Sequence, residues 1–117
     1  MGKKKREYIH FIVDIFESIQ KIEDYFFNLT EDDFLFNVEK QDAITRRLEI
    51  IGEAVKNIPM EVRNQIPAIS KQKIAGLRDV IAHDYFGIIP KRLWNIVKND
   101  IPSFKIQISE VKSKVNR

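Results

Sequence analysis

Apolar residues recur at alternating steps of four and three along most of this chain, and this spacing restricts the fold to helices. The pattern runs from Glu7 to about Asn28, from about Val38 to Asn57, from about Lys71 to Asp84, and from Pro90 toward the end. Such spacing places apolar side chains on one face of an α-helix. No stretch shows a strand signal, so the sequence predicts an all-α protein, an antiparallel bundle of four or five helices.

Local signals predict where these helices begin and end. Thr30 precedes three acidic residues, 31–33, and can cap the amide groups of a short helical turn. Pro59 and Pro67 bracket a connector that has room for one more turn. Pro102 falls inside the last helical stretch, where it should kink or interrupt the helix.

A few single residues carry expectations about packing. We expect Phe34 and Phe36 together to anchor the connection between the first two long helices, and His10 to be a half-buried packing residue. Gly52 lies inside a predicted helix, where glycine costs about 1 kcal/mol relative to alanine. A close helix crossing at Gly52 would explain its presence.

Length and composition limit the classes of protein to consider. A chain of 117 residues is expected to form a single domain, 1–117, with a core that requires no metal or disulfide. The absence of cysteine excludes thiolate metal sites and cysteine nucleophiles. No apolar run reaches the roughly 20 residues needed to span a bilayer, so we expect a cytoplasmic protein without membrane contact. The net charge of +3 permits contact with a polyanion but does not identify one.

Metal and cofactor sites are poorly supported by the sequence. Only two histidines are present, and without cysteine they make a transition-metal site improbable. The acidic residues 31–33 could suggest magnesium, but consecutive acids diverge on a helix and commonly favour its N-terminus. We therefore expect no metal and no cofactor.

The string Arg78-Asp79-Val80-Ile81-Ala82-His83-Asp84-Tyr85 is where the sequence concentrates reactive side chains. Arg78 carries five fixed hydrogen-bond donors suited to phosphate, His83 titrates near neutral pH, and Tyr85 offers a phenolic hydroxyl. Asp79 lies one turn before His83 and could orient its imidazole ring. The segment predicts a site for phosphate chemistry with proton transfer.

Helical spacing alone does not bring these groups together. At about 100° per residue, Tyr85 returns to within roughly 20° of Arg78 but lies about 10 Å further along the axis, while His83 points about 140° away. Either the helix ends near His83 and the chain bends, which Gly87 and Pro90 would permit, or a second copy of the segment completes the site.

The motif and its surroundings resemble a known family. Arg78, His83 and Tyr85 form the pattern R-x4-H-x-Y, and similar strings flank it: Ile-Gly-Glu-Ala at 51–54, Gly-Leu-Arg-Asp at 76–79, Asp-Tyr-Phe-Gly at 84–87, and Trp94 with Asp-Ile-Pro at 100–102. Together they resemble the HepT-like branch of the HEPN superfamily, small helical prokaryotic proteins encoded as toxins beside a minimal nucleotidyltransferase antitoxin. Asp79 stands where the family more typically has asparagine.

The resemblance implies a homodimer with the motif at the subunit interface and a metal-independent endoribonuclease activity. Arg78 and His83 would be catalytic toward an RNA substrate, with Asp79 in support. The antitoxin would transfer AMP to Tyr85 and so silence the toxin.

The residues by themselves leave other interpretations open. Arg78, Asp79 and His83 could form an interface salt-bridge network without catalysis, and Tyr85 could be a buried phenol with one hydrogen-bond partner. Besides a ribonuclease toxin, the chain could be a passive substrate of the nucleotidyltransferase. It could also be a non-catalytic helical module that binds nucleotides or proteins.

Overall fold

The computed structural model describes residues 2–66 and 90–115, and within these two ranges the regular structure is entirely helical. This part of the chain confirms the predicted all-α class. The helices are α1 (Gly2–Phe26), α2 (Glu31–Leu35), α3 (Val38–Lys56), α4 (Met60–Arg63), α6 (Pro90–Asn95), the π-helical turn η2 (Ile96–Asp100) and α7 (Ile101–Val115).

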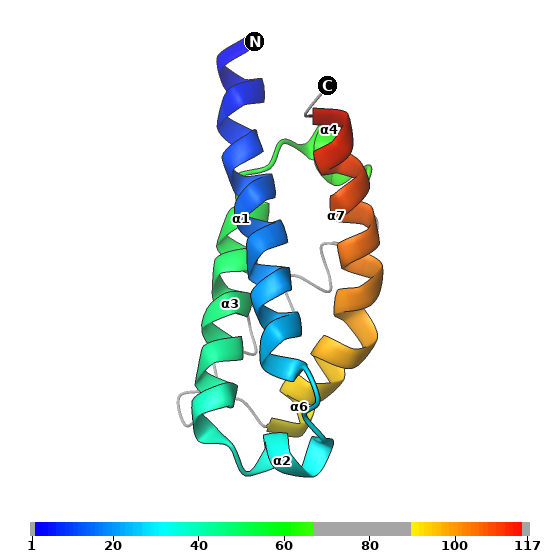
Figure 1. Ribbon diagram of the computed structural model, residues 1–117. Coiled ribbons are helices and arrows are strands. Elements are labelled where there is room, and N and C mark those ends of the chain that lie inside the picture. Colours follow the sequence, from blue (N-terminus) through cyan, green and yellow to red (C-terminus); the bar gives the residue numbers. More distant parts are fainter. Residues whose placement is uncertain (1, 67–89, 116–117) are drawn as a thin grey trace.

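Three long helices form an elongated bundle (Figure 1). The helix α1 packs against both α3 and α7, and both of these run in the opposite direction to α1. The short helices α2 and α6 lie at the lower end of the view and α4 at the upper end, where both termini also lie. α1 is therefore antiparallel to both of its long neighbours, in agreement with the predicted antiparallel bundle, whereas α3 and α7 run in the same direction.

The core consists of the apolar residues whose four-three spacing predicted the helices. Each side chain of this kind stabilises the fold by about 1.5–3 kcal/mol when it is fully buried. On α1, α3 and α7 the buried stripes are Ile12, Ile15, Ile19, Ile22 and Phe26; Ile44, Leu48, Ile51 and Val55; and Phe104, Ile108 and Val111.

The connection between α1 and α3 differs from the prediction at one position. Thr30 caps α2 as expected, because its Oγ1 accepts a hydrogen bond from the amide of Asp33 at 3.1 Å. Phe34 is fully buried, but Phe36 is 88% exposed. The expectation that both rings anchor this connection was wrong for Phe36. Residues two apart on a helical turn point about 200° apart, so burying one turns the other to solvent.

His10 and Gly52 also differ from what the sequence suggested. His10 is exposed, because it lies two positions before the buried Ile12 and so on the opposite side of α1. Gly52 is buried, yet a β-carbon added there would meet no heavy atom within 4 Å among the described residues. The expected close crossing at Gly52 is therefore absent from this part of the structure.

The interruption expected at Pro102 takes the form of a π-helical turn. α6, η2 and α7 follow one another without a gap. The amide of Ile101 donates to the carbonyl of Ile96, five residues earlier. Pro102 has no amide hydrogen to donate, and the wider turn before it carries the chain into α7 without breaking the helical path.

Candidate functional site

The four residues that the sequence singled out, Arg78, Asp79, His83 and Tyr85, all lie outside the described residues. Their mutual arrangement therefore stays a prediction. They belong to residues 67–89, called the motif segment below, and the structure describes the helices that precede and follow it in the sequence, α4 and α6. These two helices lie at opposite ends of the bundle (Figure 1).

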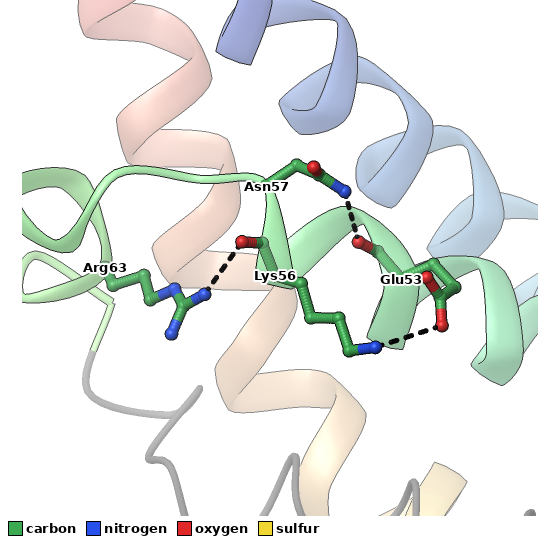
Figure 2. Close-up of polar contacts among 4 residues, drawn as sticks. All are labelled: Glu53, Lys56, Asn57 and Arg63. Carbon is green, nitrogen blue, oxygen red and sulfur yellow. Dashed lines mark hydrogen bonds and ion pairs between the residues drawn. The ribbon is translucent and has the colours of Figure 1, made fainter.

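Arg63 closes the end of α3 just before the motif segment (Figure 2). Its Nε donates to the carbonyl oxygens of Val55 at 3.0 Å and Ile58 at 3.2 Å, and its Nη2 donates to that of Lys56 at 3.0 Å. The last four carbonyls of a helix have no donor within the helix. Arg63 satisfies two of them and fastens α4 to α3, and the fully buried Ile66 ends this part of the structure.

Two further contacts hold the same helix end. The side-chain amide of Asn57 donates to the carbonyl of Glu53 at 2.9 Å, and the Lys56 ammonium pairs with the Glu53 carboxylate at 3.4 Å (Figure 2). Sequence reasoning missed the role of Arg63, which lies in a connector without regular spacing. The available signal was a basic residue shortly after a helix C-terminus, where unpaired carbonyls gather.

On the other side of the motif segment, aromatic packing fixes α6. Leu93 is fully buried. The Trp94 ring stacks on that of Phe26, with centroids 4.9 Å apart and planes 25° apart, and lies 5.8 Å from the ring of Phe34. An ion pair between Lys91 and Glu31 joins α6 to α2. The chain thus leaves the motif segment into a helix that is tied to both α1 and α2.

Beside this aromatic cluster lies an open groove between the end of α1 and the start of α7. Its volume is about 360 Å³. Buried Phe26, Val97 and Ile101 contribute to its lining. Phe27, which follows the last residue of α1, also lines the groove and is 77% exposed.

Three charged side chains also line this groove. The Lys105 ammonium pairs with the Glu23 carboxylate at 2.9 Å. Lys98 places its ammonium over the rings of Trp94 and Phe26, at 5.0 and 5.6 Å from their centroids. The spacing of residues in the sequence did not indicate that two lysines would line the same groove as Phe27.

Neither a metal site nor a membrane-spanning helix emerges from the part of the chain that the structure describes. No group of three or more histidine or acidic side chains is placed to hold a metal ion among residues 2–66 and 90–115. The acidic residues 31–33 form the first turn of α2. In the same ranges, no helix combines the length and the apolar character that a bilayer crossing requires.

Comparison with known proteins places the motif in a family context. A family model described as Ribonuclease HepT-like matches residues 15–111, a range that includes Arg78, Asp79, His83 and Tyr85. A protein of Thermococcus cleftensis named "Probable ribonuclease HepT" is 43% identical over 101 residues, which is 86% of this chain and 92% of that protein.

A longer relative matches from end to end of this chain. A protein of Methanocaldococcus jannaschii named "Gamma-glutamylcyclotransferase and putative RNase" is 41% identical over 117 residues. The match covers all of this chain and 51% of that protein, so the chain spans about half the length of this relative. No solved structure matched the chain.

Proposed function

Because the chain belongs to the HepT-like ribonuclease family, we propose that it is the toxin of a prokaryotic toxin–antitoxin pair and cleaves RNA without a metal ion. The observation that carries this proposal is the R-x4-H-x-Y motif at Arg78, His83 and Tyr85, which lies inside the range matched by the family. The relatives' names support the class of activity. The proposed place of action is the cytoplasm.

The chemistry assigns a role to each of the two catalytic residues. His83 removes the proton from a ribose 2′-hydroxyl, and the 2′-oxygen then attacks the adjacent phosphorus. The bond from phosphorus to the 5′-oxygen breaks, and a second proton transfer from histidine neutralises the leaving oxygen. Arg78 stabilises the negative charge that develops on the phosphoryl oxygens. Asp79 keeps the imidazole oriented.

The spacing of the motif favours two copies of the segment acting together. If Arg78 and His83 point in different directions on one helix, a homodimer with the motif near its two-fold axis supplies two of each group to a shared cleft. In mixed dimers that contain one His83→Ala subunit, we expect most of the cleavage to be lost. Retention of about half the activity would contradict the two-histidine arrangement.

The principal test is degradation of RNA by the purified protein in the presence of a chelator. We expect cleavage to persist with EDTA and to fall by roughly 10²-fold or more in Arg78→Ala and His83→Ala. General acid–base catalysis typically contributes about 10²–10⁴-fold, and loss of one donor that stabilises transition-state charge costs about 10²–10³-fold. His10→Ala is the matched control, because His10 is exposed on α1 and outside the motif. Equal cleavage by all three variants would contradict the assignment.

The second part of the proposal concerns control by a nucleotidyltransferase antitoxin. The phenolic oxygen of Tyr85 attacks the α-phosphorus of ATP and loses its proton, a phosphorus–oxygen bond to the tyrosine forms, and pyrophosphate leaves. The added group carries a negative phosphodiester beside Arg78 and His83, where it would compete with the RNA phosphate.

Mass spectrometry after co-expression with a neighbouring nucleotidyltransferase tests this part. We expect a gain equal to one or more adenylyl groups in the parent and no gain in Tyr85→Phe. The control is Tyr25→Phe, which changes a half-buried tyrosine on α1 and should leave the gain intact. If the chain degrades RNA but gains no mass on co-expression, the antitoxin mechanism is contradicted and the ribonuclease proposal is not. Absence of both activities would favour a non-catalytic nucleotide- or protein-binding module.

A further inference from the structure

The groove between α1 and α7 has two properties that together point to a ligand. Its volume of about 360 Å³ falls within the roughly 300–1,000 Å³ typical of small-ligand sites. Three of its lining residues, Phe26, Val97 and Ile101, are each only 7% exposed. Part of the groove wall is therefore apolar and consists of side chains that are packed in the hydrophobic core. A flat apolar group could lie against this wall without rearranging the helices.

Phe27 adds an aromatic surface that packing does not explain. Its side chain lines the groove and remains 77% exposed, whereas the adjacent Phe26 is buried against Phe34 and Trp94. An exposed aromatic ring offers a face on which a nucleobase can stack, and each such stack in single-stranded nucleic acid complexes makes a measurable contribution to affinity.

The charges in the groove suit an anion. The Lys98 ammonium lies over the rings of Phe26 and Trp94 in a cation–π interaction. Because these rings carry no charge, they do not neutralise the lysine. Lys105 is paired with Glu23, but both side chains are about half exposed, so an incoming anion can compete for the lysine. With two lysines and one glutamate, these side chains carry a net charge of +1.

We propose that this groove is a subsite for single-stranded RNA, separate in sequence from the reactive motif. One base stacks on Phe27 against the apolar wall, and Lys98 and Lys105 contact the flanking phosphates. Single-stranded RNA fits both features because each nucleotide combines a π face with a negative charge, whereas an acidic peptide would use the lysines and leave the ring without a partner. The inference rests on the proposed ribonuclease function, for which the groove would hold the substrate.

Binding of a short fluorescent oligoadenylate, followed by anisotropy in the non-cleaving His83→Ala background, tests the subsite. We expect Phe27→Ala to weaken binding roughly 5- to 150-fold, the range for loss of one stacked base. Phe36→Ala is the matched control, because Phe36 is equally aromatic and 88% exposed but is not among the residues that line the groove. It should change the affinity less than about twofold.

The lysines and Glu23 provide a signature that general damage to the fold would not produce. Lys98→Gln should weaken binding and lower the slope of log affinity against log salt by about 0.7, the value for one single-strand phosphate contact. Glu23→Gln should strengthen binding, because it releases Lys105 and removes a negative charge. Equal affinities for Phe27→Ala and Phe36→Ala would overturn the subsite. The subsite would also be overturned if polyglutamate displaced the oligonucleotide from Phe27→Ala and from Phe36→Ala equally well.

Cleavage by the protein with His83 intact separates this inference from the proposed function. We expect Phe27→Ala to raise KM at least fivefold with little change in kcat, because the ring would bind ground state and transition state alike. If Phe27→Ala cleaves RNA with an unchanged KM, the subsite is overturned and the ribonuclease proposal is retained. Absence of cleavage together with Phe27-dependent binding would overturn the ribonuclease and leave the subsite standing.

Discussion

The two ends of the bundle are closed by different kinds of interaction. At the α4 end, Arg63 donates hydrogen bonds to three backbone carbonyls at the close of α3. At the α2 and α6 end, the rings of Phe26, Phe34 and Trp94 pack together with centroids 4.9–5.8 Å apart.

The difference between the ends matters because α4 precedes the motif segment in the sequence and α6 follows it. A hydrogen-bonded closure depends on the placement of a few donor atoms, and it satisfies backbone groups that would otherwise lack partners. An aromatic closure depends on buried area and volume. The groove with the apolar wall, which Phe27 and Lys98 also line, lies at this aromatic end.

Removing a ring from the aromatic end should have the largest effect on stability. Phe34→Ala is expected to lower the free energy of unfolding by about 3–5 kcal/mol, because Phe34 is fully buried and its loss leaves a cavity between α1 and α6. Urea unfolding followed by circular dichroism measures the change. Phe36→Ala is the control and should change the free energy by less than about 0.5 kcal/mol. Similar losses from both substitutions would contradict an aromatic closure centred on Phe34.

Arg63→Ala should weaken the hydrogen-bonded end by a smaller amount, about 2 kcal/mol. The substitution removes a charged donor from the carbonyls of Val55, Lys56 and Ile58, and hydrogen bonds that involve a charged group contribute about 1.5–3 kcal/mol. The same unfolding measurement applies. Arg63→Lys keeps the charge but loses the planar donor group, so it should recover only part of the loss. Full recovery by lysine would show that charge alone closes this end.

Gly52→Ala should have the smallest effect and the opposite sign. Because a β-carbon at Gly52 meets no atom within 4 Å among the described residues, alanine should raise the free energy of unfolding by about 0.5–1 kcal/mol through its greater helix propensity. Thermal unfolding should show a modest increase in Tm. Destabilisation would instead reveal a close neighbour of Gly52, and with it a tighter packing near the α4 end than the described residues show.

Much of the fold could be predicted from the spacing of apolar residues. The stripes on α1 and α3 are buried as the four-three rhythm required, and Thr30 caps α2. Single side chains in connections were harder to predict. Phe34 and Phe36 look alike in the sequence, but Phe34 lies on α2 and is buried, whereas Phe36 is the C-cap two positions later and is exposed. The predicted catalytic set, Arg78 and His83 with Tyr85 and Asp79, was identified by residue type and motif and stays a prediction in its geometry.

The sequence by itself determined the helical class, the buried faces and the family motif, because periodicity and short motifs are local properties of the chain. Only the tertiary structure placed Arg63 against the end of α3, stacked Trp94 on Phe26, and brought Lys98, Lys105 and Phe27 into the lining of one groove. These residues lie far apart in the sequence or in stretches without regular spacing. Their contacts arise from the way α1, α3 and α7 pack, and that packing depends on the shapes of many side chains at once.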